Sequence, residues 1–299
     1  MSIPDLRNYR RDAVSGFLRT QRAGASPDPS SPAFDPVGER RVAGMRREEV
    51  AWAAGISLDY YVKLEQGRML NPSPSVLESI MEALRLSDLG RRYLRLLFED
   101  NPPQVARTAA GDRQLARATL DEVVAHFPEA TMRHILDRDL HLVLPDAASR
   151  SILFPDLAEP TEELSLVDYM FAGQYREHSR RVYVDWRDKA AEVIGLVHMK
   201  LVTRVASDEL VATVQGLLHD PAFRRLWTRY QPYQNTSGSW RLRLPDDDGR
   251  TTVRDCRYIT VTAADDPEQC LVIYLRERAG RLGGTDRDRA DTAVTRRRR

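Results

Sequence analysis

The chain has 299 residues, a formal net charge of +1, and 42% hydrophobic and 30% charged residues. That composition is typical of a globular protein with a sizeable core, and the length favours two domains. The longest apolar runs, such as residues 271–275, are too short to cross a bilayer, and the N-terminus lacks a secretory signal pattern. We therefore expect a cytoplasmic protein with no membrane partner.

The first hundred residues carry mostly helical patterns. Residues 1–22 carry an amphipathic helical pattern, with Phe17 and Leu18 on the apolar side of residues 12–22. A loop is expected over residues 23–38, because its four prolines cannot continue a helix. Helical pattern resumes at residue 45 and continues with breaks to residue 99, where Asn101-Pro102-Pro103 follows and ends it.

A helix-turn-helix pattern occupies residues 46–67. Such a motif needs two short helices that touch at a steep angle across a sharp turn. Ala51 is small enough for that contact, Gly55 can take the left-handed conformation that ends the first helix, and Ser57 can cap the second. Gly67 is expected to stop the second helix. The other core positions are predicted at Val50, Ala54, Ile56, Tyr61 and Leu64.

A helix, a glycine turn and a second helix also occur in many helical proteins that do not bind DNA, so Gly55 alone carries little weight. The combination with Ala51, Ser57 and the Glu65-Gln66-Gly67 ending is far more specific. It favours sequence-specific binding to double-stranded DNA. Two roles stay open for Asp59, which can cap the second helix or read a base.

The stretch that ends in Glu65-Gln66-Gly67 resembles the phage-repressor (XRE) family of helix-turn-helix domains. This resemblance implies that the second helix enters the major groove of DNA. Lys63 could donate to guanine, Asp59 could accept from cytosine, and Leu58 could meet a thymine methyl group, with Tyr60 nearby. The residues expected at phosphates are Arg40, Arg41, Arg46, Arg47, Ser57, Arg68, Ser73 and Ser75.

The second half of the chain predicts helices packed on an antiparallel sheet of four or five strands. Alternating Leu140, Leu142 and Leu144 suggest a short strand. Ser207 can cap the helix that follows it. The predicted helices span residues 113–127, 161–173, 185–205, 208–219 and 221–230. Further strands are predicted at residues 240–244, 251–262 and 270–275.

Cysteine and histidine usage gives no sign of a metal site. Cys256 and Cys270 should lie well apart if the last two strands pair, and a cytosolic protein is expected to keep them as free thiols. No CxxC or HExxH spacing occurs, and the six histidines are scattered. No metal and no cofactor are therefore expected.

Several segments resemble the actinobacterial MmyB-like regulators, in which an XRE domain precedes a ligand-binding domain with a PAS-like fold. The resemblance is close through residue 99, where it rests on Phe17-Leu18-Arg19, Tyr60-Tyr61 and the residues 72–77 among others. It is found again at Asp185-Trp186, at residues 223–227 and in the final strands. The asparagine–alanine and arginine–asparagine signatures of that family are not evident at residues 144–147 and 171–174.

This second resemblance implies a sensory domain for a small apolar ligand, with fatty-acyl molecules as the leading candidates. Tyr233, Asn235 and Ser237 are candidates for a polar mouth or for a plain loop. Ordinary core packing also explains each expected lining residue, and the domain could instead serve only for dimerisation or protein interaction. The lining residues implied are Trp186, Trp227, Tyr258, Ile273 and Tyr274.

Catalysis is a further class of function to weigh against the residues. Asp185 with His178, or His198 with His219, would be its acid–base candidates. The spacing brings no nucleophile, base and orienting group together, and no glycine-rich phosphate loop occurs. We therefore expect no enzymatic activity.

The fold class expected is an all-α, five-helix XRE-type domain followed by an α+β PAS-like domain with an antiparallel sheet. The domains are predicted at residues 1–100 and 113–279, with a linker at 101–112 and a disordered basic tail at 280–299. The expected function is regulation of transcription by a homodimer on an inverted-repeat operator at the nucleoid. RNA polymerase is a further candidate partner.

Overall fold

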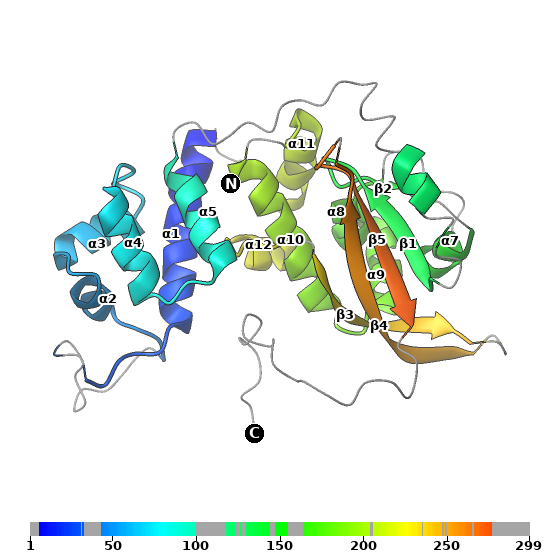
Figure 1. Ribbon diagram of the computed structural model, residues 1–299, viewed down its shortest axis with the longest axis horizontal. Helices are drawn as coiled ribbons and strands as arrows, with labels where there is room; N and C mark the ends of the chain where they lie inside the picture. The colour runs from blue at the N-terminus through cyan, green and yellow to red at the C-terminus, as the bar shows by residue number, and fades with distance from the viewer. Residues whose placement is uncertain are drawn as a thin grey trace. The chain divides into compact units, whose positions relative to one another are not determined.

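The computed structural model describes residues 6–30, 32, 43–99, 118–123, 126, 130–143, 147–154, 164–203, 206–234, 236–246, 248, 250–264 and 266–276. They form two compact units (Figure 1). Within these ranges, the helical unit comprises residues 6–99 and Trp227–Pro232, and the sheet unit comprises residues 118–226 and 233–276. The predicted linker and basic tail lie outside the described residues.

Among its described residues, the helical unit contains the five expected α-helices. They are α1 (Leu6–Gly24), α2 (Arg47–Ala53), α3 (Leu58–Glu65), α4 (Pro74–Ala83) and α5 (Asp88–Phe98). The side chains of Ser57, Ser73 and Ser87 cap the last three helices by accepting from a backbone N–H three residues further on. Helix α1 begins at Leu6, inside the segment predicted to be helical, and its Tyr9 is buried.

The segment Trp227–Pro232 joins the helical unit from far along the chain. The rings of Trp227 and Tyr230 each lie with their centroids 6.1 Å from that of Tyr9 on α1. A Cβ atom added at Gly16, also on α1, would overlap the Tyr230 ring. Gly16 therefore gives this ring the room to pack on α1.

The sheet unit is built on one antiparallel sheet, which has five strands in the described part of the chain. Its strand order is β2-β1-β5-β4-β3. The strands are β1 (Met132–Leu136), β2 (Leu142–Val143), β3 (Ser237–Pro245), β4 (Thr251–Thr262) and β5 (Cys270–Arg276). The three C-terminal strands confirm the predicted ones, whereas β1 was not predicted.

The strand expected from Leu140 onward is shorter than the alternation indicated. Leu140 has a left-handed backbone with φ of 65° and lies in the turn between β1 and β2. The strand therefore begins at Leu142, and Leu144 lies outside the described residues.

Six helices with defined bounds accompany the sheet in the described residues. They are α7 (Ala147–Leu153), α8 (Leu166–Phe171), α9 (Gly173–Val182), α10 (Trp186–Val202), α11 (Asp208–Leu217) and α12 (Pro221–Trp227). Residues 118–123 are also helical. Ser207 caps α11 as predicted. No described helix is long and apolar enough to span a membrane.

Two helix predictions were wrong in extent. The helix expected to end at residue 173 stops at Phe171, because Ala172 is extended and Gly173, with φ of 41°, starts α9 in a new direction. The helix expected to reach residue 230 stops at Trp227, since Tyr230 takes a left-handed conformation with φ of 48°.

The two faces of the sheet differ in chemistry. Ile135, Leu271 and Ile273 form an apolar core cluster with Leu120 from the helical residues 118–123. Side chains of successive strand residues point to opposite faces, so Tyr274 lies on the other face from Ile273. Tyr258 is the cross-strand partner of Tyr274, and their ring centroids lie 5.7 Å apart.

The two cysteines lie apart on neighbouring strands, as predicted. Cys256 on β4 is paired with Arg276, at the other end of β5 from Cys270. Neither of these two cysteines forms a disulfide bond. Burial raises the pKa of Cys270 to about 11, so this thiol stays protonated and weakly reactive near neutral pH.

Candidate nucleic-acid interface

A sharp turn between α2 and α3 sets the direction of the second helix. Gly55 has a left-handed φ of 66°, and its N–H donates to the carbonyl oxygen of Trp52 at 3.0 Å. The N–H of Ile56 donates to the carbonyl oxygen of Ala51, also at 3.0 Å. These bonds satisfy carbonyl groups at the end of α2. The Ser57 hydroxyl then accepts from the N–H of Tyr60 and starts α3.

The two helices share a buried core, which leaves one face of α3 outside. Val50, Ala51 and Ala54 of α2 are buried, as are Tyr61 and Leu64 of α3. All five were predicted as core positions. The same period leaves residues 58, 59 and 63 on the outer side of the helix.

Glu65 anchors the end of α3 inside the helical unit. Its carboxylate is 1% exposed and accepts from Arg22 Nε at 2.6 Å and from Arg47 Nε at 2.8 Å. Burial by itself would raise the pKa of Glu65, but the two guanidinium groups lower it below its usual value. The sequence indicated Glu65 only as part of a motif, and no spacing pointed to Arg22, 43 residues earlier.

Gly67 ends the motif with a left-handed backbone that lies close to α1. Its φ is 64°, and an added Cβ atom would lie 2.6 Å from the carbonyl oxygen of Arg11 on α1. The Arg11 side chain also donates to the carbonyl oxygen of Gly67 at 3.2 Å. A residue with a side chain would therefore separate α3 from α1.

The residues predicted to face bases lie on one exposed surface. Leu58 is 46% exposed, an unusual position for a large apolar side chain. The side chains of Asp59 and Lys63 are 74% and 51% exposed and form an ion pair of 2.6 Å across one helical turn. Tyr60 is partly exposed beside them. Ser57, and not Asp59, is the N-cap of α3. Asp59 lies in the first turn of the helix, with its carboxylate exposed.

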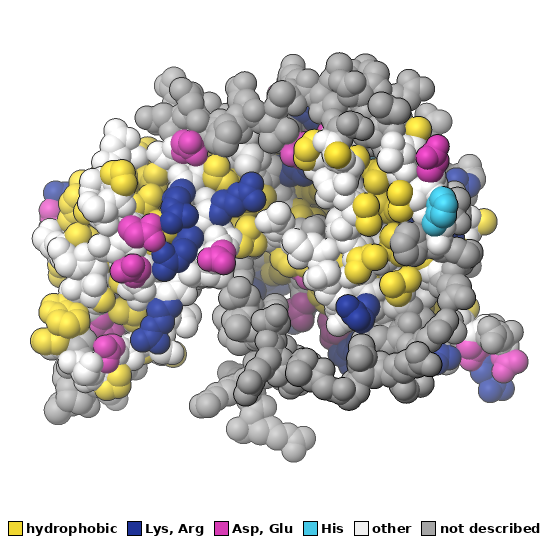
Figure 2. Space-filling view, viewed as in Figure 1, with side chains coloured by type: hydrophobic (Ala, Val, Ile, Leu, Met, Phe, Trp, Pro, Cys, Tyr) yellow, Lys and Arg dark blue, Asp and Glu magenta, His cyan; other side chains and the backbone are white. Residues whose placement is uncertain are grey.

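The residues predicted to contact phosphates lie at several places in the helical unit. Arg47, Arg68, Ser73 and Ser75 are exposed, and Arg46 is partly exposed. The Ser73 hydroxyl caps α4 and lies 3.0 Å from the Ser75 hydroxyl. Lys and Arg side chains alternate with acidic ones over the visible face of the helical unit (Figure 2). Arg40 and Arg41 lie outside the described residues.

Trp52 is an exposed residue that the sequence analysis did not single out. It lies on α2 and is 51% exposed, and a tryptophan is rarely so exposed in a core-facing helix. Its spacing from the core residues Val50, Ala51 and Ala54 could have indicated that it points outward.

The five residues expected to line a ligand pocket are all buried, but the structure does not bring them together. Tyr258 and Tyr274 are neighbours on one face of the sheet, and Ile273 lies on the other. Trp186 packs against Phe171, with ring centroids 5.7 Å apart. Trp227 belongs to the helical unit.

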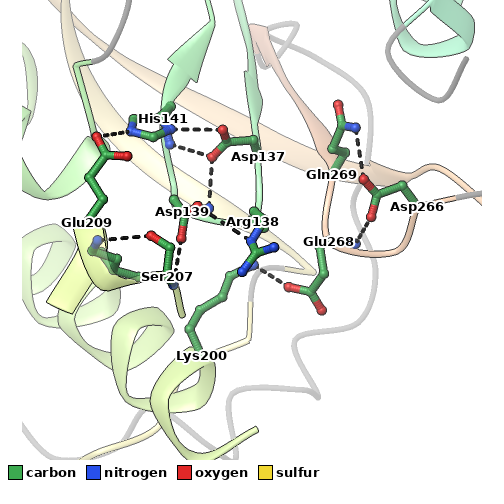
Figure 3. Close-up of polar contacts among 11 residues, drawn as sticks. Asp137, Arg138, Asp139, His141, Lys200, Ser207, Glu209, Asp266, Glu268 and Gln269 are labelled. Carbon is green, nitrogen blue, oxygen red and sulfur yellow. Dashed lines mark hydrogen bonds and ion pairs between the residues drawn. The ribbon is translucent and has the colours of Figure 1, made fainter. Parts of the chain in front are cut away.

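A polar network links the β1–β2 turn to the start of α11 (Figure 3). His141 contacts Asp137 Oδ2 through Nδ1 at 2.9 Å and Glu209 Oε1 through Nε2 at 3.3 Å. Asp139 Oδ1 accepts from the backbone N–H of Ser207 at 3.0 Å. Burial lowers the pKa of His141, but the two carboxylates outweigh this and raise it above its usual value. The network therefore fastens the β1–β2 turn to the start of α11.

The acid–base candidates of the enzyme hypothesis have other contacts. Asp185 accepts two bonds from Arg241, at 2.7 and 3.0 Å. His198 is fully buried, whereas His219 is exposed. Among the described residues no group of three or more His, Cys, Asp or Glu side chains could hold a metal ion.

Comparison with protein-family models gives two matches that follow the two units. Residues 6–94 match a helix-turn-helix domain. Residues 116–281 match the MmyB-like transcription regulator ligand binding domain, which covers more than half of the chain. A comparison with curated proteins gave no match.

Proposed function

The chain belongs to the MmyB-like transcription regulators, and from this premise we propose that it acts as a homodimer on an inverted-repeat operator. Its helix-turn-helix domain is that of a DNA-binding regulator. A protein with this activity works on the chromosome, so we place it in the cytoplasm at the nucleoid. We further propose that its C-terminal domain senses a small apolar molecule, with fatty-acyl compounds as the first candidates.

The observation that carries the proposal is the exposed surface of α3. Leu58, Asp59 and Lys63 project from a helix whose start is fixed by the Gly55 turn and the Ser57 cap. In this arrangement the early residues of the second helix reach base edges in the major groove. Each well-placed base contact contributes roughly 1–3 kcal/mol of discrimination.

We propose a homodimer because one helix-turn-helix contacts only a short stretch of DNA. A single helix-turn-helix reads only a few base pairs, while two related by a two-fold axis read half-sites about one helical turn apart. Arg46, Arg47 and Arg68 would fix the register of each half by contacting phosphates. Serine hydroxyls at Ser73 and Ser75 would add contacts at the start of α4.

The segment Trp227–Pro232 supports communication between sensing and DNA binding. Its residues pack on α1 of the helical unit, while the residues before and after it in sequence belong to the sheet unit. Phe223, one turn earlier on α12, packs against Phe171 with ring centroids 5.0 Å apart. A ligand that shifts this core would therefore act on a helix that continues directly into the α1 contact.

A second candidate for the C-terminal domain is dimerisation or protein interaction without a ligand. Complete burial of the five expected lining residues is consistent with plain core packing. Native mass spectrometry of the purified protein separates the two, since a sensory domain should retain a lipid-sized molecule.

The DNA-binding proposal is tested by footprinting on DNA from upstream of the gene for this protein. We expect protection of a two-fold symmetric segment with half-sites about one turn apart. The Lys63→Ala variant should lose this protection at the same concentration, and Arg92→Ala, which removes an exposed charge on α5, should retain it. Equal binding of the wild-type protein to scrambled DNA would contradict the proposal.

A further inference from the structure

Strand β4 carries an ordered set of side chains on one face of the sheet. Val253, Asp255 and Arg257 are exposed, and Ile259 is partly buried. Successive strand residues point to opposite faces, so these four side chains share the face away from the buried Tyr258. Along the strand this outer face presents an apolar, an acidic, a basic and an apolar side chain.

The outer face is also apolar beyond these four residues. Ile259, Val261 and Leu275 pack at the margin of the core cluster around Ile273 and are only partly buried. Val253 is 54% exposed. Hydrophobic side chains gather over the strands of the sheet unit on the face in view in Figure 2. Exposed apolar surface that is flanked by charged residues is typical of a protein-interaction site.

The two charged residues of this face can pair with a partner protein. Among the described residues, neither Asp255 nor Arg257 forms an ion pair. The cross-strand neighbour of Asp255 is Arg241, which already donates two hydrogen bonds to another carboxylate. The cross-strand neighbours of Arg257 are uncharged.

A two-fold axis makes the order of these side chains complementary to itself. Sheets that pack face to face lie about 10 Å apart, with strand directions within about 30° of each other. An axis between the two sheets, at the level of Cys256, sets two copies of β4 antiparallel to each other. Arg257 of each copy then faces Asp255 of the other, and Val253 faces Ile259.

The neighbouring strand β3 fits the same axis. Its register with β4 places Arg241 beside residue 255 and Ser239 beside residue 257. The axis therefore brings Arg241 of one copy opposite Ser239 of the other, and Arg243 opposite Ser237. No like charges meet on this strand.

We propose that the outer face of the sheet, centred on residues 253–259 of β4, is the interface of the homodimer. The inference rests on the proposed homodimer and names the surface that forms it. An isologous contact uses the same surface twice, and the order of side chains on β4 meets that requirement. A partner of a single charge sign would instead place a like charge against Asp255 or Arg257.

Sedimentation equilibrium of the full-length protein tests the interface through charge reversal. Asp255→Arg and Arg257→Asp each create two like-charge pairs, so each should raise the dimer dissociation constant about ten- to a hundredfold. The double variant Asp255→Arg/Arg257→Asp restores two attractive pairs and should dimerise like the wild-type protein. Arg254→Asp changes an exposed charge on the opposite face of the same strand and should leave the constant unchanged.

A mixture of the two single variants gives a result that misfolding cannot produce. The Asp255→Arg variant carries two arginines on this face, and the Arg257→Asp variant carries two aspartates. A mixed dimer therefore contains two opposite-charge pairs. The two variants should associate with each other about ten- to a hundredfold more tightly than either associates with itself.

The outcomes separate the interface from the dimer on which it rests. If the charge-reversal variants dimerise as tightly as the wild-type protein, or if the mixture gains no affinity, this face is not the interface while the homodimer stands. If the wild-type protein stays monomeric at every concentration, with and without operator DNA, the proposed homodimer fails together with its interface.

Discussion

Glu65 shows how one side chain can hold the second helix of the motif, α3, in place. Its buried carboxylate joins Arg22 of α1 to Arg47 of α2, and it lies at the end of α3. Three helices therefore meet at one charge. Removing a single partner from a buried ion pair leaves the opposite charge uncompensated.

We expect Glu65→Gln to lower the free energy of unfolding by about 3 kcal/mol, because two guanidinium groups lose their counter-ion. Urea denaturation measures this loss. Glu48→Gln on the exposed side of α2 is the matched control and should change stability by less than about 0.5 kcal/mol. Equal stability of the two variants would show that the Glu65 network contributes little.

At the scale of single residues, the sequence predicted the outer face of α3 better than the interior of the sheet unit. Gly55, Ser57 and Leu64 each have a local role that a short pattern reveals. The rings around Lys189 belong to Tyr183, which follows α9, to Trp240 on β3 and to Tyr258 on β4, and no local pattern brings them together. Ile273 and Tyr274 could not share a pocket wall, since adjacent strand residues face opposite ways.

Among the strands, the alternating β3 was predicted, whereas β1, which is buried on both faces, was missed. Strand β3 alternates buried and exposed residues, which gives a clear period of two. Strand β1 lies between β2 and β5, and nearly all of its side chains are buried, so its sequence shows no alternation. The α8–α9 break depends on Gly173, whose left-handed φ cannot be told from sequence alone.

The packing of Trp227–Pro232 on α1 can be tested with two glycines that both lie within helices. Gly16→Ala should destabilise the protein by about 1–3 kcal/mol, because the new methyl group overlaps the Tyr230 ring. Gly216→Ala on α11 meets no atom and should stabilise it by up to about 1 kcal/mol. Thermal unfolding of the two variants compares them directly.

If Gly16→Ala is as stable as Gly216→Ala, the Tyr230 ring does not rest on α1 in solution. A second variant, Gly16→Ala/Tyr230→Ala, should recover part of the lost stability, since it removes the overlapping ring.

The His141 network predicts a pH dependence for the link between the β1–β2 turn and α11. The folded pKa of His141 is raised above its ordinary value of 6.5, so its stabilising effect is complete below that pH. The effect is lost as pH rises through the folded pKa. The stability difference between the wild-type protein and His141→Asn should therefore be larger at about pH 5.5 than at about pH 8.5.

Chemical denaturation at both pH values measures this difference. His219→Asn, at an exposed histidine, controls for the general effect of losing an imidazole. A His141→Asn penalty that stays constant, or grows toward alkaline pH, would contradict the ion pairs of His141 with Asp137 and Glu209.

For the molecule as a whole, composition and helical pattern predicted two units and their fold classes. The return of Trp227–Pro232 to the helical unit was not predictable, because it depends on the Tyr230 ring, which fits over Gly16 more than two hundred residues away in sequence. Trp227 was predicted to line the ligand pocket because the sequence around a buried tryptophan does not show whether it packs in the helical unit or in the sheet unit. The proposed function assigns DNA reading to the helical unit and ligand sensing to the sheet unit.

The central claim is that Lys63 and its neighbours on α3 read bases directly. Its most direct test measures the affinity of the wild-type protein and of Lys63→Ala for the operator and for every single-base-pair variant of it, at one salt concentration. We expect Lys63→Ala to lose about 1–3 kcal/mol of discrimination at one symmetry-related base pair in each half-site and to keep the rest. A discrimination profile that is unchanged at every position would contradict the claim.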